Sequence, residues 1–173
     1  MEPADHAIGR SRGGLTSKLH LVVDGQGLPL SVLLTAGQAG DNPQLLPLLD
    51  TIHVPRPGPG RPRSRPDEVI ADKAYSHPST RTALRRRGVA FTAPERSDQI
   101  ARRAARGSAG GRPPTFHAET YKRRNVVERC FNRLKQWRGI ATRYDKTAVN
   151  YRGGILLTLI VLWTRQQDRG DTP

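Results

Sequence analysis

The pattern of apolar and polar residues predicts four strands along this chain. The segments Leu15 to Asp24 and Leu28 to Thr35 flank the letters GQG, and the sequence DGQGLP between them is typical of a β-hairpin. The short apolar run Val69 to Ala71 predicts a buried strand, and Val89 to Ala93 predicts another strand that ends at Pro94. The chain is therefore expected to begin with a hairpin and to continue with two separate strands.

Helix signals lie between these strands. The letters GDNP predict a helix start, with Asn42 as the N-cap and Pro43 at the first helical position. The helix NPQLLPLLDTI would follow, although Pro47 would fall in its middle, where proline is unfavourable. The segment His77 to Gly88 predicts a basic helix with Gly88 as its C-cap.

Two more helices are predicted nearer the C-terminus. One covers Tyr121 to Trp137, and the other runs from about Ala148 to Gln166. The second contains the apolar run Ile155 to Trp163, which is much shorter than the about 20 residues that cross a bilayer, so we expect a buried core helix. The order strand, strand, helix, strand, helix, strand, helix, helix predicts an α/β domain.

Segments without a clear period divide the chain. Residues 1–14 are polar and Gly-rich and are expected to be a flexible lead-in, residues 15–167 form the predicted domain, and residues 168–173 are a tail. The letters VPRPGPGRPRSRPDE predict a mobile loop rich in Pro, Gly and Arg. Residues 95–120 are Arg-rich and too few for an independent domain, so they predict a short basic loop inserted in the domain.

The charge balance indicates a polyanionic partner. Lys and Arg number 29 against 15 Asp and Glu, which gives a formal net charge of +14 in 173 residues. Nucleic acid is the first candidate because the guanidinium group matches phosphate geometry, although ribosomal and nucleoid proteins share this balance without being enzymes. The single cysteine, Cys130, excludes an internal disulfide and fits a reducing cytoplasm. The N-terminus lacks the hydrophobic stretch of a signal peptide.

The segment YKRRNVVERCFNRLK carries the strongest chemical pattern. On a helix of roughly 3.6 residues per turn, a phenol, two cations and a carboxylate fall within roughly 60° of one another. These residues are Tyr121, Arg124, Glu128 and Lys135. The apolar residues fall on the opposite side, and they are Val126, Val127, Cys130, Phe131, Leu134 and Trp137. We therefore expect Cys130 and Trp137 in the core, and Arg123 is the one misfit on the apolar side.

This helix face suits chemistry on a phosphate backbone, because a carboxylate can hold a metal ion while cations hold phosphates. From the helix pattern alone, an ordinary amphipathic helix with a charged outer face is the more frequent explanation. Asp72, which directly follows the strand Val69 to Ala71, is a second candidate metal ligand because the carboxyl ends of strands line functional crevices. The local alternative is that Asp72 is a turn or N-cap residue.

The spacing of these four residues is also a family pattern. Tyr, two residues, Arg, three residues, Glu, six residues, Lys resembles the YREK pattern of bacterial insertion-sequence transposases. Together with RCFNRLKQWRGIATRYDK, it resembles the family-five group of these elements. The resemblance also includes GRSRGGLTSKLHLVVD and VIADKAY, so it covers nearly the whole chain. It implies an RNase H-like α/β fold, of the ribonuclease H and integrase type, with a mixed sheet and flanking helices.

The resemblance implies a DDE active site for DNA transposition. Asp72 matches the second acidic residue of the triad and Glu128 matches the third. In the family, two divalent ions, Mg²⁺ or Mn²⁺, are held by such carboxylates for DNA strand cleavage and strand transfer. Arg124 and Lys135 would hold phosphates near the cleaved bond, and Tyr121 would contact the DNA end. The implied partners are transposon-end and target DNA, bound by a dimer or a larger assembly.

The first acidic residue of the triad has no good candidate in this chain. In the family it lies on a strand upstream of GRSRGG, whereas Asp24 is expected in the hairpin turn and Asp5 follows no predicted strand. The chain therefore resembles an N-terminally truncated transposase, expected to be weakly active or inactive alone. A product of frameshifting, completed by an upstream frame or fusion that supplies the Asp, and a remnant are both compatible with this sequence.

Further basic residues are expected to follow the DNA backbone with little base discrimination. They are Arg102, Arg103 and Arg106 in the basic loop, and Arg129 and Arg133 on the flank of the predicted helix. Two alternatives remain open from the sequence. One is a non-catalytic basic nucleic-acid-binding protein, and the other is a different RNase H-like nuclease, which would not need the Tyr121, Arg124, Glu128, Lys135 quartet.

Overall fold

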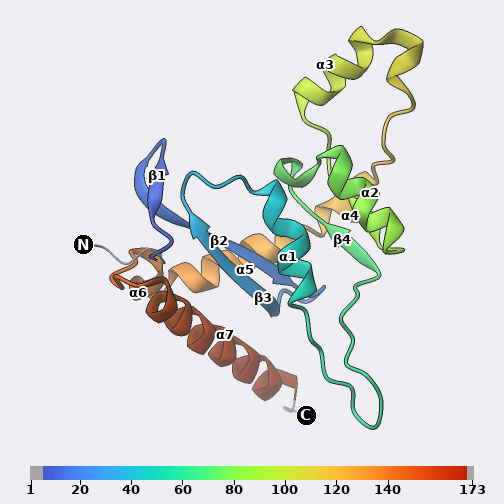
Figure 1. Cartoon of the computed structure of the whole chain (residues 1–173). Coiled ribbons are helices and arrows are strands. Elements are labelled where there is room, and N and C mark those ends of the chain that lie inside the picture. The colour runs from blue at the N-terminus through green and yellow to red at the C-terminus, as the bar shows by residue number, and fades with distance from the viewer. Residues whose placement is uncertain (1–5, 171–173) are drawn as a thin grey trace. The chain divides into compact units, whose positions relative to one another are not determined.

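The protein is described by a computed structural model that covers residues 6–170, with side chains through residue 166 (Figure 1). The chain divides into two compact units. The first unit combines Met1–Gly40 with Asn125–Pro173, and the second unit is Asp41–Arg124. Each unit has a sheet of its own, so the two are described in turn.

The first unit contains a three-stranded antiparallel sheet in the order β1-β2-β3. Its strands are β1 (Gly9–Ser11), β2 (Gly14–Val23) and β3 (Pro29–Ala36), with Leu19 opposite Leu34 in the central pair. The predicted hairpin is therefore confirmed.

The turn of this hairpin is organised by Asp24. Its Oδ1 accepts hydrogen bonds from the amides of Gln26 at 2.9 Å and Leu28 at 2.8 Å. Gly27 has φ +84°, a left-handed conformation that favours glycine. Asp24 is thus a turn residue, as the sequence predicted.

Arg143 ties the start of the first unit to the connection before the last helix. Its guanidinium donates to the carbonyl oxygens of His6 and Ala7 and to the hydroxyl of Ser17. It also lies 5.0 Å from the centroid of the Tyr151 ring, which is a cation–π contact. The strand β1 lies inside residues 1–14, for which flexibility stays a prediction.

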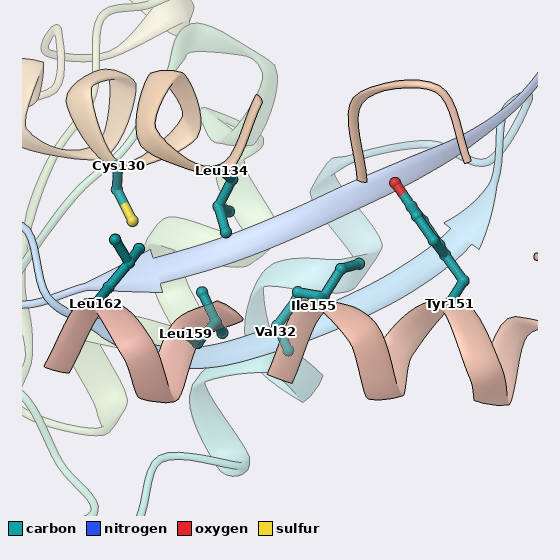
Figure 2. Packing of buried hydrophobic residues seen from close by; sticks show 7 residues of the cluster. All are labelled: Val32, Cys130, Leu134, Tyr151, Ile155, Leu159 and Leu162. Atoms are coloured by element: carbon teal, nitrogen blue, oxygen red, sulfur yellow. The ribbon is translucent and has the colours of Figure 1, made fainter. Parts of the chain in front are cut away.

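Helices α5 (Asn125–Lys135), α6 (Arg138–Ala141) and α7 (Ala148–Gly170) complete the first unit. The predicted last helix is confirmed, and one of its faces is buried. Figure 2 shows the core between α5, α7 and the sheet, in which the Cys130 sulfur points toward Leu162. The core residues are Val32, Cys130, Leu134, Tyr151, Ile155, Leu159 and Leu162. None of the helices described is long and apolar enough to cross a membrane.

The second unit contains a parallel pair, β4 (Glu68–Ile70) and β5 (Ala90–Thr92). The connection between them includes η2 (Lys73–Tyr75) and α2 (Pro78–Arg86), which makes a βαβ crossover. His77 caps α2 by accepting from the Ser79 amide, and Gly88 follows the helix with φ +66°. The two predicted strands and the basic helix are confirmed, although β4 is only partly buried, and the chain as a whole has a mixed α/β fold.

The first helical segment of this unit differs from its prediction. It consists of η1 (Asn42–Gln44) followed by α1 (Leu45–Asp50). Asn42 is not the N-cap, because its Oδ1 accepts a hydrogen bond from the Thr80 hydroxyl at 2.9 Å. Since α1 begins at Leu45, Pro47 falls in the first turn, where a backbone N–H has no helical partner to lose.

The predicted basic loop at residues 95–120 is largely helical. It contains α3 (Ser97–Ala105), η3 (Gly107–Gly110) and the start of α4 (Ala118–Lys122). Ala, Gln and Arg are good helix formers, and Asp98 in the first turn pairs with Arg102 one turn later. The description of this segment as a loop was wrong, because its high Arg and Gly content concealed nine residues with helix propensity.

Candidate functional site

Asp72 lies at the carboxyl end of β4, where the sequence placed it. The ladder to β5 continues through a hydrogen bond from the Ala71 amide to the Thr92 carbonyl at 3.0 Å. Asp72 is the N-cap of η2, and its Oδ1 accepts from the Ala74 amide at 3.0 Å. The N-cap alternative is therefore confirmed, and it uses one of the two carboxylate oxygens of a half-buried side chain.

Tyr75 belongs to the same local site and was not singled out from the sequence. Burial, followed by the nearby charges of Asp41 and Asp72, raises the pKa of Tyr75 from 10.0 to about 12. A neutral phenol therefore stands close to two carboxylates at physiological pH. The signal was available, because Tyr75 follows Asp72 by three residues, one turn of a 3₁₀ helix.

A titration tests this placement of Tyr75. The absorbance difference between the wild-type chain and Tyr75→Phe should titrate with a midpoint near pH 12 rather than 10.0, as long as circular dichroism shows a folded chain. Because the raised pKa favours the neutral phenol in the folded state, its contribution to stability is complete below about pH 10 and is lost toward pH 12. Asp72→Asn should lower this midpoint, and a midpoint at 10.0 would contradict the arrangement.

The predicted helix Tyr121 to Trp137 is broken. Tyr121 lies on α4, Arg124 lies in the turn after it, and α5 begins at Asn125. The amides of Arg123 and Arg124 bond to carbonyls three residues earlier, at 3.1 and 3.0 Å, which tightens and ends α4. The prediction that the four residues share one helix stripe was therefore wrong, because the stripe is interrupted between Arg124 and Glu128.

Arg123, the misfit of the helix pattern, has a specific partner in the second unit. Its Nη2 donates to Oε2 of Glu68 on β4 at 2.9 Å, and the Thr92 hydroxyl of β5 donates to Oε1 of the same carboxylate at 3.1 Å. This network joins the end of α4 to both parallel strands. In addition, the Arg124 guanidinium lies 5.4 Å from the centroid of the Tyr121 ring.

Glu128 and Lys135 lie seven residues apart on α5, both exposed and on the same face. The opposite face buries Cys130 and Leu134, as predicted, and burial raises the pKa of the Cys130 thiol. Trp137 is 39% exposed, so its predicted core position was wrong. The helix ends at Lys135 and Trp137 caps α6, so the helical spacing does not extend to it.

Asp72 belongs to the second unit and Glu128 belongs to the first. Both are hard oxygen donors of the kind that bind Mg²⁺. Among the residues described, no three His, Cys, Asp or Glu side chains gather in a group that could hold a metal ion. Each carboxylate therefore fits a divalent ion as one ligand of a site that needs others.

The predicted DNA-contacting arginines differ in their surroundings. Arg102 pairs with Asp98 at 2.8 Å, and Arg103 makes a bidentate pair with Glu95 in which both side chains are largely buried. The Arg133 Nη2 donates to the Gly27 carbonyl at 2.6 Å, which ties α5 to the hairpin turn. Arg129 is exposed. Arg133 thus has a structural role within the first unit, whereas Arg106 and Arg129 are more open to a ligand.

Comparison with known proteins gives a consistent result. Residues 2–163 match the family described as Transposase DDE domain. The chain is 36% identical over 153 residues to a putative transposase for insertion sequence element IS6501 of Brucella ovis, covering 87% of this chain and 100% of that protein. It is 37% identical over 139 residues to a putative transposase for IS402 of Burkholderia cepacia, covering 80% of this chain and 57% of that protein. No solved structure matches the chain.

Proposed function

The chain belongs to the family of DDE transposases of bacterial insertion sequences, the enzymes of DNA transposition, and from this premise we propose that Asp72 and Glu128 are two carboxylates of its active site. One observation carries the proposal: Asp72 stands at the carboxyl end of β4 with Oδ1 fixed by the Ala74 amide. That hydrogen bond orients the carboxylate and leaves Oδ2 available to a ligand. The family's reaction is cleavage of a DNA strand followed by strand transfer.

The two carboxylates would act as ligands for divalent ions, Mg²⁺ or Mn²⁺. The chemistry that such ions supply is activation of a water or a 3′-hydroxyl and stabilisation of the leaving oxygen. Asp72 is oriented by its cap hydrogen bond, and Glu128 projects from a helix anchored by the buried Cys130 and Leu134. Rigid elements of this kind hold ligands in fixed positions, which metal sites require.

The chain's cations would hold the DNA. Lys135 lies on the same face of α5 as Glu128, so both would meet the same stretch of backbone. Arg129 flanks this face, while Arg124 and Tyr121 lie side by side just before it. We further propose the RNase H-like fold, supported by an antiparallel hairpin and a parallel pair in one chain.

We also propose that a third carboxylate comes from outside the described residues, through an upstream frame or a fused segment. The hairpin turn supports this, because Asp24 accepts two backbone hydrogen bonds there and thus serves as a turn residue. The isolated chain is then expected to be weakly active or inactive, and assembly as a dimer or more on DNA would complete the complex. Robust Mg²⁺-dependent cleavage of transposon-end DNA by the isolated chain would refute this part of the proposal.

The salt dependence of DNA binding tests the role of α3 and the turn after it. Replacing Arg102, Arg103 and Arg106 by Ala is expected to weaken binding at least about tenfold at low salt. The slope of log K against log salt should fall by about 1 to 3, since each phosphate contact contributes about 0.9. The measurement is fluorescence anisotropy with a labelled duplex at several salt concentrations.

The matched control replaces the same three arginines by Lys, which keeps the charge, and its salt slope should remain close to that of the wild type. An unchanged slope in the Ala variant would show that this segment does not contact phosphates. A non-catalytic DNA-binding protein would give the same salt result, so the carboxylate substitutions argued in the Discussion separate that alternative.

A further inference from the structure

The loop between α1 and β4 is paired at its base and exposed to solvent at its tip. An isolated antiparallel bridge joins Val54 and Arg63, with backbone hydrogen bonds of 3.0 and 2.8 Å. The eight residues between them, 55–62, form an arm that extends beyond α1 and β4, the elements it connects (Figure 1). Every residue of the arm is exposed except Pro62, which is partly buried.

The arm carries two arginines without a partner. Counting outward from the bridge, Arg56 and Arg61 stand at the same level on its two sides. Neither makes a hydrogen bond or an ion pair with any residue that the structure describes, and no carboxylate lies between residues 55 and 62. Farther down, Arg63 pairs with Asp67, and Arg65 donates to the Arg87 carbonyl. The outer pair therefore presents positive charge to an external ligand.

The composition of the arm makes it stiff and narrow. Four of its eight residues are prolines, which fix φ and remove the amide N–H, and the tip is Pro57-Gly58-Pro59-Gly60. Gly58 and Gly60 have positive φ, and nothing lies within 4 Å of a Cβ added at either position. At about 3.1 Å per residue, four residues on each side reach about 12 Å beyond the bridge. Ordering such a segment on a ligand costs little conformational entropy.

We propose that this arm, residues 55–62, inserts into the minor groove of A·T-rich DNA, with Arg56 and Arg61 in the groove. The inference rests on the proposed DNA-binding function and adds a recognition mode to it. A·T-rich tracts have a narrow minor groove with enhanced negative potential, which attracts arginine. The groove is about 7.5 Å deep, within the reach of the arm. Proline at the tip of such arms is also suited to contact between base steps.

The major groove fits this arm less well. It is about 12 Å wide and is usually filled by a helix or a two-stranded ribbon with long side chains. The tip of the arm has only Pro and Gly, so it offers no side-chain hydrogen-bond donors for the base edges there. Arg56 and Arg61 have the only polar side chains of the arm, and the weak hydration of the guanidinium group favours a confined, negatively charged groove.

The test compares two labelled duplexes of equal length, one with a central A-tract and one with mixed G·C-rich sequence at the same place. The wild-type chain is expected to prefer the A-tract duplex by on the order of tenfold at fixed salt. Netropsin, a small molecule that occupies the minor groove of A·T tracts, should abolish the preference. The double variant Arg56→Ala, Arg61→Ala should bind both duplexes equally.

Two further variants make the result specific. The double substitution Arg56→Lys, Arg61→Lys keeps the charge but should lose most of the preference, because ammonium groups are more strongly hydrated. Arg85→Ala with Arg86→Ala removes two exposed arginines of α2 in the same unit and should keep the preference. Circular dichroism confirms that the exposed substitutions leave the fold intact.

The outcomes separate the inference from the function on which it rests. DNA binding without A-tract preference, or a preference that survives the Ala variant or netropsin, would overturn the arm proposal and leave DNA binding standing. Tighter binding to an RNA duplex would also overturn it. No binding to either DNA duplex would overturn the proposed DNA-binding function itself.

Discussion

Glu128→Gln is expected to lower the transposition frequency of the complete element in bacterial cells at least about a hundredfold, and Asp72→Asn should do the same. Replacing a residue that only supports a metal ligand costs about 10- to 100-fold, so loss of a ligand itself should cost at least the upper value. Both substitutions remove a negative charge while keeping the size of the side chain. The measurement is the frequency of insertion into a target plasmid.

The substitution Asp72→Asn distinguishes the proposed role of Asp72 as a metal ligand from its role as the N-cap of η2. Asn is as good an N-cap as Asp, so Asp72→Asn keeps an oxygen that accepts from the Ala74 amide and preserves η2. Its fold and thermal stability should therefore remain close to those of the wild type while transposition is lost. If the residue served only as a cap, transposition would persist in this variant.

Matched controls lie near both positions in the sequence. Asp67→Asn, in the same unit as Asp72, changes a carboxylate that is 91% exposed and pairs with Arg63. Glu119→Gln changes an 84% exposed carboxylate on α4 that pairs with Lys122. Both should leave the transposition frequency unchanged, because exposed ion pairs contribute little to stability. If the control variants lost as much transposition frequency as the Asp72 and Glu128 variants, the proposal that Asp72 and Glu128 are metal ligands would be contradicted.

Local patterns in the sequence predicted the elements that depend on local chemistry. The DGQGLP turn specified the hairpin because Asp24 caps its own turn two and four residues later. The four predicted strands were recovered for the same reason, since turn and capping signals act over a few residues, whereas β1, α3 and α6 were not predicted. Asp72 was placed correctly because it immediately follows a short apolar strand.

Contacts between distant residues produced the errors. The Asn42 side chain accepts a hydrogen bond from Thr80, 38 residues later, instead of capping a helix. The Arg123 side chain pairs with Glu68, 55 residues earlier. The second contact accompanies the end of α4, which divides the predicted stripe of Tyr121, Arg124, Glu128 and Lys135. Arg123 was the one residue that did not fit the predicted helix pattern, and it lies where the helix is interrupted, between α4 and α5. No local pattern indicated the partner.

The arginine-rich segments show a related limit. Composition predicted positive charge at residues 95–120 but not which charges are already paired. Arg103 with Glu95 and Arg102 with Asp98 form ion pairs within the second unit, whereas Arg56 and Arg61 have no partner among the residues described. Net charge alone therefore does not distinguish paired from unpaired arginines. The free pair lies in the segment that the sequence described only as a mobile loop.

Ile155→Ala is expected to lower the free energy of unfolding by about 2–5 kcal/mol, the range for deleting a large buried aliphatic side chain. Ile155 is 0% exposed in the core of the first unit, between α5 and the sheet (Figure 2). The substitution removes buried apolar surface and leaves a cavity that close packing cannot fill completely. Urea unfolding followed by circular dichroism measures the change.

Ile160→Ala is the matched control on the same helix. Ile160 is 58% exposed, so the same substitution should change the free energy of unfolding by about 0.5 kcal/mol or less. The gain in helix propensity from Ile to Ala is common to both variants, so their difference isolates burial. If both variants lost equal stability, the outer face of α7 would have to be covered in solution. A concentration dependence of the transition would then identify another copy of the chain as the cover.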